Sequence, residues 1–325
     1  MSDTPFSHIA VLGAGAWGTA LALAAHGAGR STTLWVREPD VLAALQAGGE
    51  NRFLPGVTLP KDLAVTGDLA AAAKADALLL AVPAQLLRGF LDTLKPHLTP
   101  GRPLVICAKG IEKGSGKLVT EVLVEAAPKA AAAILSGPSF ARDVARGLPT
   151  AVTIAAKDGL AEKLQASLNS MSFRPYASDD LTGVALGGAA KNVYAIACGV
   201  VEGMGLGENA RAALLARSFA ELARLGEGLG AKRETLMGLS GLGDLVLTAT
   251  SKSSRNFSYG AAIGAGVAPD GKLAEGVDTA PALVARARTV GVELPIAEAM
   301  ADLLSGALPL GETVMRLMSR RPTTE

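Results

Sequence analysis

The sequence predicts an α/β protein in which a doubly wound, mostly parallel sheet is followed by an all-α domain. Strand patterns alternate with helical patterns through residues 8–169, which is typical of a parallel sheet covered by helices on both faces. After about Asp179 the strand patterns stop and only helical periods remain. We therefore expect a sheet domain at residues 1–185 and an all-α domain at residues 186–325.

The predicted strands are short runs of apolar, β-branched or aromatic residues. Residues 76–82 (DALLLAV) form an almost unbroken apolar run, which is typical of a strand buried on both faces, and Pro83 ends it. Residues 132–135 are ambiguous, because their small side chains suit a helix as well as a strand. The other predicted strands are residues 8–12, 32–36, 103–107 and 150–155.

Helical patterns fill the segments between these strands and then the whole of the second domain. The helix after the first strand consists of small and apolar residues, and the next helix ends at Gly48 and Gly49. The predicted helices are 16–28, 39–47, 85–95, 116–126 and 159–169 in the first domain, and 179–204, 208–229, 278–290 and 294–305 in the second.

Composition argues against several classes of protein. Lys and Arg number 31 and Asp and Glu number 30, so nothing indicates a surface for nucleic acid or a polybasic membrane patch. The two cysteines, Cys107 and Cys198, lie in apolar runs, and the three histidines show no ligand spacing. We expect no disulfide framework, no metal and no nucleic-acid partner.

The apolar segments do not predict export or membrane insertion. The N-terminus, MSDTPFSH, is polar and leads directly into a strand, so it lacks the pattern of a signal peptide. Pro83 breaks the apolar run around Leu78, and Lys191 and Asn192 interrupt the next one. A cytoplasmic protein is expected.

The segment GAGAWG at 13–18 follows the first predicted strand and opens the helix after it. In this context a G-x-G-x-x-G pattern predicts dinucleotide binding in a Rossmann-like domain. Gly13 permits a tight turn, Gly15 lets the backbone approach a pyrophosphate, and Gly18 lets the helix pack closely on the strand. The free N–H groups at the helix start would bind the phosphates. The alternative is a glycine-rich turn that binds nothing.

Arg37 and Glu38 follow the second predicted strand, where NAD sites usually place an acidic residue against the ribose 2′-hydroxyl. An arginine at that position can pair with the 2′-phosphate of NADP, so we expect NADP to be favoured. A shift of one residue would put Glu38 in that position and restore a preference for NAD. A third alternative leaves Arg37 solvated.

Two polar segments follow later strands, at the edge where open α/β sheets bind ligands. Lys109 is flanked by Gly110 and is placed to meet a phosphate or a carbonyl. The segment SGPSFA at 136–141 offers backbone N–H groups at Gly137 and the hydroxyl of Ser139. The alternatives are a solvated surface lysine and an ordinary turn.

Lys191 lies in GGAAKNVYAIA at 187–197, a predicted helix made otherwise of small and mostly apolar residues. A lysine buried there is unfavourable unless it has a partner or a task, so it is predicted to be a general acid. The alternative is a side chain that extends to the surface.

Two further polar clusters lie downstream. Asp244 places a carboxylate in an apolar segment, and SSRN at 253–256 lies at a predicted helix start. Arg255 at such a start is suited to clamp a phosphate. Asp244 and Ser254 could instead be helix caps.

Together these segments resemble the bacterial type of the NAD(P)-dependent glycerol-3-phosphate dehydrogenase family. The matching stretches occur in the family's order and spacing and cover most of the chain. AAKNVYAIACG, GLGDLVLT and SRN are the most specific of them, and the others are GAGAWGTALA, NRFLPGV, AKGIE, SGPSFA and LAEGVDTA.

The resemblance implies a role for each matching residue. Lys191 would be the catalytic proton donor or acceptor. The substrate would be bound by Lys109, Gly137, Ser139, Lys191, Asp244, Ser254, Arg255 and Asn256. The cofactor would be contacted by Gly13, Gly15, Ala16, Trp17, Gly18, Arg37, Lys109, Ala141, Arg255, Leu273 and Glu275. The family often has serine at the position of Ala16, so this chain lacks one hydroxyl there.

The implied reaction is reversible hydride transfer between NAD(P)H, with NADPH favoured, and dihydroxyacetone phosphate to give sn-glycerol 3-phosphate for glycerophospholipid synthesis. The resemblance also implies a homodimer. A rival interpretation is a β-hydroxyacid or ketopantoate-type reductase, whose substrates carry carboxylates. A non-catalytic NAD(P) sensor would need the glycine-rich turn but not Lys191, Asp244 and Arg255 together.

Overall fold

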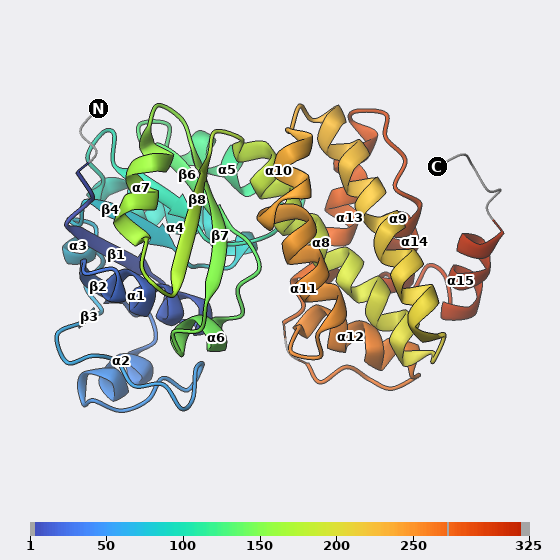
Figure 1. Cartoon of the computed structure of the whole chain (residues 1–325), viewed down its shortest axis with the longest axis horizontal. Helices are drawn as coiled ribbons and strands as arrows, with labels where there is room; N and C mark the ends of the chain where they lie inside the picture. Colours follow the sequence, from blue (N-terminus) through green and yellow to red (C-terminus); the bar gives the residue numbers. More distant parts are fainter. Residues whose placement is uncertain (1–3, 272, 320–325) are drawn as a thin grey trace. The chain divides into compact units, whose positions relative to one another are not determined.

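The computed structural model describes residues 4–271 and 273–319, which divide into two compact units. The first unit comprises the described residues up to Lys109 and Leu118–Ala185, and the second comprises Gly110–Lys117 and the described residues from Leu186 onward (Figure 1). The sequence prediction places residues 110–117 in the first domain. They group instead with the second unit, in which Lys113 Nζ lies 2.5 Å from Asp278 Oδ1.

The first unit is built on an eight-stranded sheet in the order β3-β2-β1-β4-β5-β6-β7-β8. All neighbouring strands are parallel except β6 and β7, which are antiparallel, so the predicted mostly parallel sheet is confirmed. The strands are β1 His8–Leu12, β2 Ser31–Trp35, β3 Ala64–Thr66, β4 Ala77–Leu80, β5 Pro103–Ile106, β6 Ala131–Ser136, β7 Thr150–Ala156 and β8 Phe173–Ser178.

The central strands are buried on both faces, as their unbroken apolar runs predict. In β1, Leu12 is paired in register with Trp35 of β2 and with Leu80 of β4. All four residues of β4 are fully buried. The ambiguous segment 132–135 belongs to β6, which pairs with β5 on one side and β7 on the other.

Two strands escape the sequence prediction because they lie at the two edges of the sheet. β3 has only three residues, and β8 contains Pro175. Each edge strand has a single neighbour, and an edge is the place where a sheet tolerates proline.

Helices cover both faces of this sheet. α1 and α7 share a core with Ile9 and Val11 of β1, whereas α4 and α5 pack against each other. The predicted helix 85–95 is divided into η1 and α4. The helices of the first unit are α1 Ala16–Gly27, α2 Pro39–Gln46, α3 Leu69–Ala72, η1 Ala84–Leu86, α4 Leu87–Leu94, η2 Lys95–His97, α5 Val119–Ala126, α6 Ala141–Ala145 and α7 Leu160–Leu168.

From Leu186 onward the described part of the second unit is built from helices. Four of its helices were predicted, as was a helix start at residues 253–256, whereas the other short helices were not. The helices are α8 Leu181–Gly203, which begins in the first unit, α9 Gly207–Gly228, α10 Arg233–Met237, η3 Leu239–Gly243 (a π-helix), α11 Asp244–Thr250, α12 Arg255–Gly264, α13 Glu275–Arg288, α14 Pro295–Leu304 and α15 Leu310–Met318.

By length and composition alone α8 could span a membrane, although Lys191 and Asn192 lie within it. Within the protein, 94% of its most apolar 18-residue window is buried, so it is a core helix.

Glycines bring the backbones of α8 and α12 into direct contact. A methyl group at Gly199 or Gly203 would overlap a carbonyl oxygen of α12, and one at Gly260 or Gly264 would overlap a carbonyl oxygen of α8. Such an approach excludes every side chain larger than hydrogen at these four positions. As a result, α12 lies closer to α8 than ordinary side-chain packing permits.

Glu221 of α9 joins three helices through its buried carboxyl group. Its Oε1 accepts a hydrogen bond from the Ile296 N–H at 2.7 Å, and its Oε2 accepts from the Ala297 N–H at 3.3 Å, so it satisfies the first turn of α14. Oε2 also accepts from the hydroxyl of Tyr194 on α8 at 3.2 Å. Burial outweighs these hydrogen bonds and raises the pKa of Glu221 to about 7.

Replacing glycine by alanine should have opposite effects at the α8–α12 contact and on an open helix surface. Gly199→Ala or Gly260→Ala forces the two backbones apart and should lower the free energy of unfolding by roughly 1–3 kcal/mol or more. Gly89→Ala in α4 meets no atom within 4 Å and should raise it by roughly 0.5–1 kcal/mol. Urea denaturation measures all three, and equal effects at Gly199 and Gly89 would contradict the contact.

The pKa of Glu221 predicts how stability changes with pH. Because this pKa is raised from 4.5 to about 7, the unfolded chain releases the proton first, and stability is lost as the pH rises through that window. Glu221→Gln removes the titration. Relative to the parent chain, this variant should gain on the order of 3 kcal/mol between pH 5 and pH 8 in denaturant titrations. A difference that does not change with pH would count against a buried, titrating Glu221.

Candidate active site

The glycine-rich turn joins β1 to α1 with the geometry that its spacing predicts. Gly13 has a φ of +115°, and a Cβ there would lie 2.8 Å from the carbonyl oxygen of Ala81. A Cβ on Gly18 would overlap the carbonyl oxygen of Gly13, so the helix packs directly on the turn. A Cβ on Gly15 would meet nothing within 4 Å. The turn is therefore closed towards the protein and open at Gly15.

The residues at this opening fit the pyrophosphate of a dinucleotide. Gly15 is the N-cap of α1 and provides no side chain to bind the free N–H groups of the first turn, which also holds no acidic residue. Ala16 and Trp17 begin the helix. The buried indole Nε1 of Trp17 has no hydrogen-bond partner among the described residues, so it is a donor that a ligand can satisfy.

Asn51 fastens this turn from a distant loop. Its Nδ2 donates to the carbonyl oxygen of Ala14 and to Oγ1 of Thr19, both at 2.8 Å, and its Oδ1 accepts from the Phe53 N–H at 2.9 Å. The side chain is fully buried. Asn51 therefore sets the position of the glycine-rich turn, although the sequence prediction assigned it no role.

Arg37 and Glu38 both lie just beyond β2, where the ribose of a dinucleotide would be recognised. The guanidinium group of Arg37 is exposed, and its Nη2 donates to Glu38 Oε1 at 2.7 Å. Because the two side chains pair with each other, each is held at the end of the strand, and a 2′-phosphate would have to compete with Glu38 for the arginine.

Three predicted substrate residues meet at one carbonyl group after β5 and β6. Lys109 Nζ donates to the carbonyl oxygen of Gly137 at 3.1 Å, and Ser139 Oγ donates to the same oxygen at 2.9 Å. A Cβ on Gly137 would lie 2.8 Å from Cα of Val152 on β7. Ala141 begins α6 directly after this turn. Because β1, β4, β5 and β6 are parallel, this cluster and the glycine-rich turn share the carboxyl edge of the sheet.

Lys191 forms the centre of a buried polar cluster in the second unit. Its Nζ lies 2.5 Å from Asp244 Oδ1 and donates to Thr248 Oγ1 at 2.8 Å. Lys191 is 7% exposed and Asp244 is 1% exposed, so the pair is shielded from water. Lys191 therefore does not extend to the surface, and Asp244, which opens α11, directs its carboxylate to the ammonium group.

A second polar cluster begins at the next residue of α8. Asn256 Nδ2 donates to Asn192 Oδ1 at 2.9 Å, and Asn256 Oδ1 accepts from the Gly276 N–H at 2.9 Å. The amide Nδ2 of Asn192 is buried and has no partner among the described residues. Its two N–H groups are therefore available to a ligand oxygen.

The predicted phosphate clamp lies at the start of α12. The hydroxyl of Ser254 accepts from the Phe257 N–H at 3.2 Å, so Ser254 is the N-cap of that helix. Arg255 is the first residue of α12 and is exposed. A cation beside free helix N–H groups suits a phosphate.

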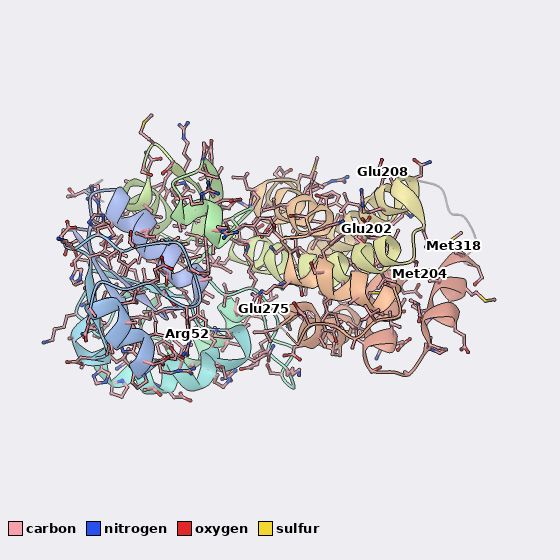
Figure 2. All side chains as sticks on the ribbon, turned by 90° about the horizontal axis from the view of Figure 1, so that it is seen from below. Arg52, Glu202, Met204, Glu208, Glu275 and Met318 are labelled. Carbon is pink, nitrogen blue, oxygen red and sulfur yellow. The ribbon has the colours of Figure 1, made fainter. Side chains whose placement is uncertain are left out.

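The last two predicted cofactor residues belong to the second unit. Leu273 is half exposed, and Glu275 begins α13, one residue before the Gly276 N–H that Asn256 binds (Figure 2). Arg52, which is labelled in Figure 2, follows Asn51 and forms an ion pair with Asp40. It shows where the loop lies that carries Asn51 and holds the glycine-rich turn of the first unit.

Sequence reasoning missed three side chains that these clusters contain. Thr248 lies four residues after Asp244, one helical turn away, and this spacing was the available signal. Asn192 is an amide in an otherwise apolar helix segment, and Asn51 is a polar residue in a loop. Nothing in the local sequence indicates the long-range partners of the last two.

Comparison with known proteins identifies relatives over most of the chain. Residues 8–161 match the family described as NAD-dependent glycerol-3-phosphate dehydrogenase N-terminus, and residues 180–315 match its C-terminus. A glycerol-3-phosphate dehydrogenase [NAD(P)+] from Afipia carboxidovorans is 57% identical over 318 residues, with 98% of each chain covered. The crystal structure of glycerol-3-phosphate dehydrogenase from Coxiella burnetii has a TM-score of 0.91 at 37% identity, with 98% of this chain and 100% of that chain covered.

A ketopantoate reductase from Ralstonia eutropha is a more distant structural neighbour. It has a TM-score of 0.60 at 16% identity, covering 95% of this chain and 99% of that one. This likeness concerns the fold alone.

Loss of the Asn51 amide should loosen the glycine-rich turn and weaken dinucleotide binding. Asn51→Asp keeps the shape but cannot donate to Ala14 and Thr19, and each unsatisfied buried acceptor costs about 1–3 kcal/mol. We expect lower stability and a dissociation constant for the dinucleotide that rises about tenfold or more, measured by calorimetry. Glu50→Gln on the same loop is the matched control, and equal effects in the two variants would contradict the role of Asn51.

Proposed function

Because the chain belongs to the NAD-dependent glycerol-3-phosphate dehydrogenase family, we propose that it interconverts dihydroxyacetone phosphate and sn-glycerol 3-phosphate, using NADPH or NADH. The observation that carries the proposal is the buried ammonium group of Lys191, which Asp244 and Thr248 orient. A carbonyl reductase needs such a proton donor in a site shielded from water.

Lys191 performs the proton transfer. A bound nicotinamide would supply the hydride for the ketone carbon, so that negative charge would develop on the carbonyl oxygen. Lys191 stabilises that charge and donates a proton to the oxygen, and in the reverse direction it accepts the proton of the hydroxyl group. Asp244 and Thr248 each bind the ammonium group and so hold it in position.

The substrate phosphate is bound at the start of α12. Arg255 provides a full positive charge there, and the buried Nδ2 of Asn192 provides donors with no partner among the described residues. Asn256 orients Asn192 by donating to its Oδ1. The substrate contacts expected of Lys109, Gly137, Ser139 and Ser254 stay predictions, as do the cofactor contacts of Ala141, Leu273 and Glu275.

NADPH is proposed as the favoured cofactor. The exposed guanidinium group of Arg37 at the end of β2 supports this choice, because it can bind a 2′-phosphate. Its pairing with Glu38 weakens the preference for NADPH, because the 2′-phosphate has to compete with the carboxylate. Parallel assays of dihydroxyacetone phosphate reduction with NADPH and NADH measure it directly. We further propose a homodimer that acts in the cytoplasm and whose product enters glycerophospholipid synthesis.

A ketopantoate-type or β-hydroxyacid reductase is not favoured. The match to the glycerol-3-phosphate dehydrogenase family covers both units, whereas the likeness to a ketopantoate reductase is limited to the fold. No oxidation of either reduced cofactor by dihydroxyacetone phosphate, in folded protein that binds the cofactor, would reject the proposed substrate.

Replacing the proton donor should abolish most turnover and leave cofactor binding in place. Lys191→Ala should lower kcat about 10²–10⁴-fold, the usual contribution of general acid catalysis. Thr248→Val keeps the shape and removes only one acceptor of the ammonium group, so we expect a smaller loss of kcat with little change in KM. Lys157→Ala, at an exposed position, is the control, and turnover near normal in Lys191→Ala would refute the mechanism.

A further inference from the structure

The second unit contains a cavity of about 1060 Å³ that no residue of the proposed catalytic machinery lines. Its walls come from the C-terminal half of α8, from α9, α14 and α15, and they are mostly apolar. Met204, which follows α8, and Met318 of α15 are two of the lining residues, and Figure 2 shows both at the same end of the unit. Each of the four helices contributes apolar side chains to the wall, for example Val200, Leu214, Met300 and Leu317.

Side chains on the cavity wall are exposed to solvent, so a ligand can enter the cavity from outside. Among the described elements, α15 packs chiefly on α14, and Leu206 and Met318 on the cavity wall remain 46% and 80% exposed. Large apolar side chains that are exposed together indicate a binding site for an apolar ligand or partner. Methionine side chains adapt their shape to different apolar ligands.

Two arginines give this apolar cavity a positive site. Arg217 and Arg224 lie on one face of α9, two turns apart, and both line the cavity. Neither forms a close ion pair or a hydrogen bond with another described residue, although Arg224 acts electrostatically on the buried Glu221 and lowers its pKa. Two guanidinium groups beside apolar walls are suited to a ligand with an anionic end and an aliphatic body.

The acidic groups at the cavity do not cancel its preference for a ligand with an anionic end. Glu221 lies between the two arginines on α9, but its oxygens already accept from Ile296, Ala297 and Tyr194. Its raised pKa, about 7, also keeps much of it protonated at neutral pH. Glu293, the other acidic lining residue, already has an interaction of its own.

We propose that this cavity binds a fatty-acid carboxylate, with the hydrocarbon chain between α8, α9, α14 and α15 and the carboxylate on Arg217 and Arg224. The carboxylate matches the planar fork of a guanidinium group, and the apolar walls remove the chain from water. The site is separate from Lys191 and Asp244, so this proposal stands independently of the reaction proposed above.

Isothermal titration of the full chain with decanoate, decan-1-ol and decyltrimethylammonium tests the proposal, because the three probes share a tail and differ in charge. We expect saturable one-to-one binding of decanoate, at least tenfold weaker binding of the alcohol and none of the cation. Arg217→Gln and Arg224→Gln should each raise the dissociation constant for decanoate about tenfold or more. Arg233→Gln, at an exposed arginine of α10, should leave it unchanged.

A variant that fills the cavity separates this site from binding elsewhere. Ala213 lines the cavity from the exposed side of α9, so Ala213→Trp should abolish decanoate binding while circular dichroism and turnover stay as in the parent chain. Equal binding of all three probes, or decanoate binding that survives Ala213→Trp, would overturn the proposal. So would an absence of binding together with self-association that Ala213→Trp prevents, which would assign the surface to a second copy of the chain.

Discussion

Direct backbone contact between α8 and α12 is the constraint on which the second unit depends. Four glycines, two on each helix, make this approach possible. Gly187 and Gly276 extend the same principle, because a Cβ at either would lie 2.5 Å from a carbonyl oxygen, of Ser240 and of Asn192 respectively. The helices that carry Asp244, Asn256 and Glu275 are thereby held around one central helix, and short side chains such as asparagine can bridge between them.

This close packing also explains how charged groups are kept away from water. Removing Lys191 and Asp244 from solvent is unfavourable, and an isolated buried ion pair adds little net stability. Their mutual contact and the hydroxyl of Thr248 satisfy both groups within the protein. Glu221 is the structural counterpart, since its carboxyl group joins α8, α9 and α14 through three donors. The same long helix thus carries a cluster suited to proton transfer and another that holds the helices together.

Local patterns in the sequence predicted most of the first unit and the type of the second. Buried parallel strands such as β4 and β5 are recognisable because both of their faces are apolar. The antiparallel pairing of β6 with β7 depends on contacts distant in sequence, and the edge strands β3 and β8 have weak patterns of their own. At the candidate site, Lys191 and Asp244 were predicted because charge is conspicuous in an apolar segment. Asn51 was not, because its importance arises only when the loop meets Ala14 and Thr19.

The octapeptide Gly110–Lys117 belongs to the second unit although the chain on either side of it belongs to the first. It is synthesised long before α8, when the sheet of the first unit is still incomplete. It therefore cannot make its contacts within the second unit until the later helices have been synthesised. A fragment ending at residue 185 keeps Ile111, which is fully buried in the whole protein, without the helices of its unit. A fragment starting at residue 186 lacks Lys113, the partner of Asp278. The two units are therefore not interchangeable modules, and recombination at their sequence boundary would divide both a helix and a core.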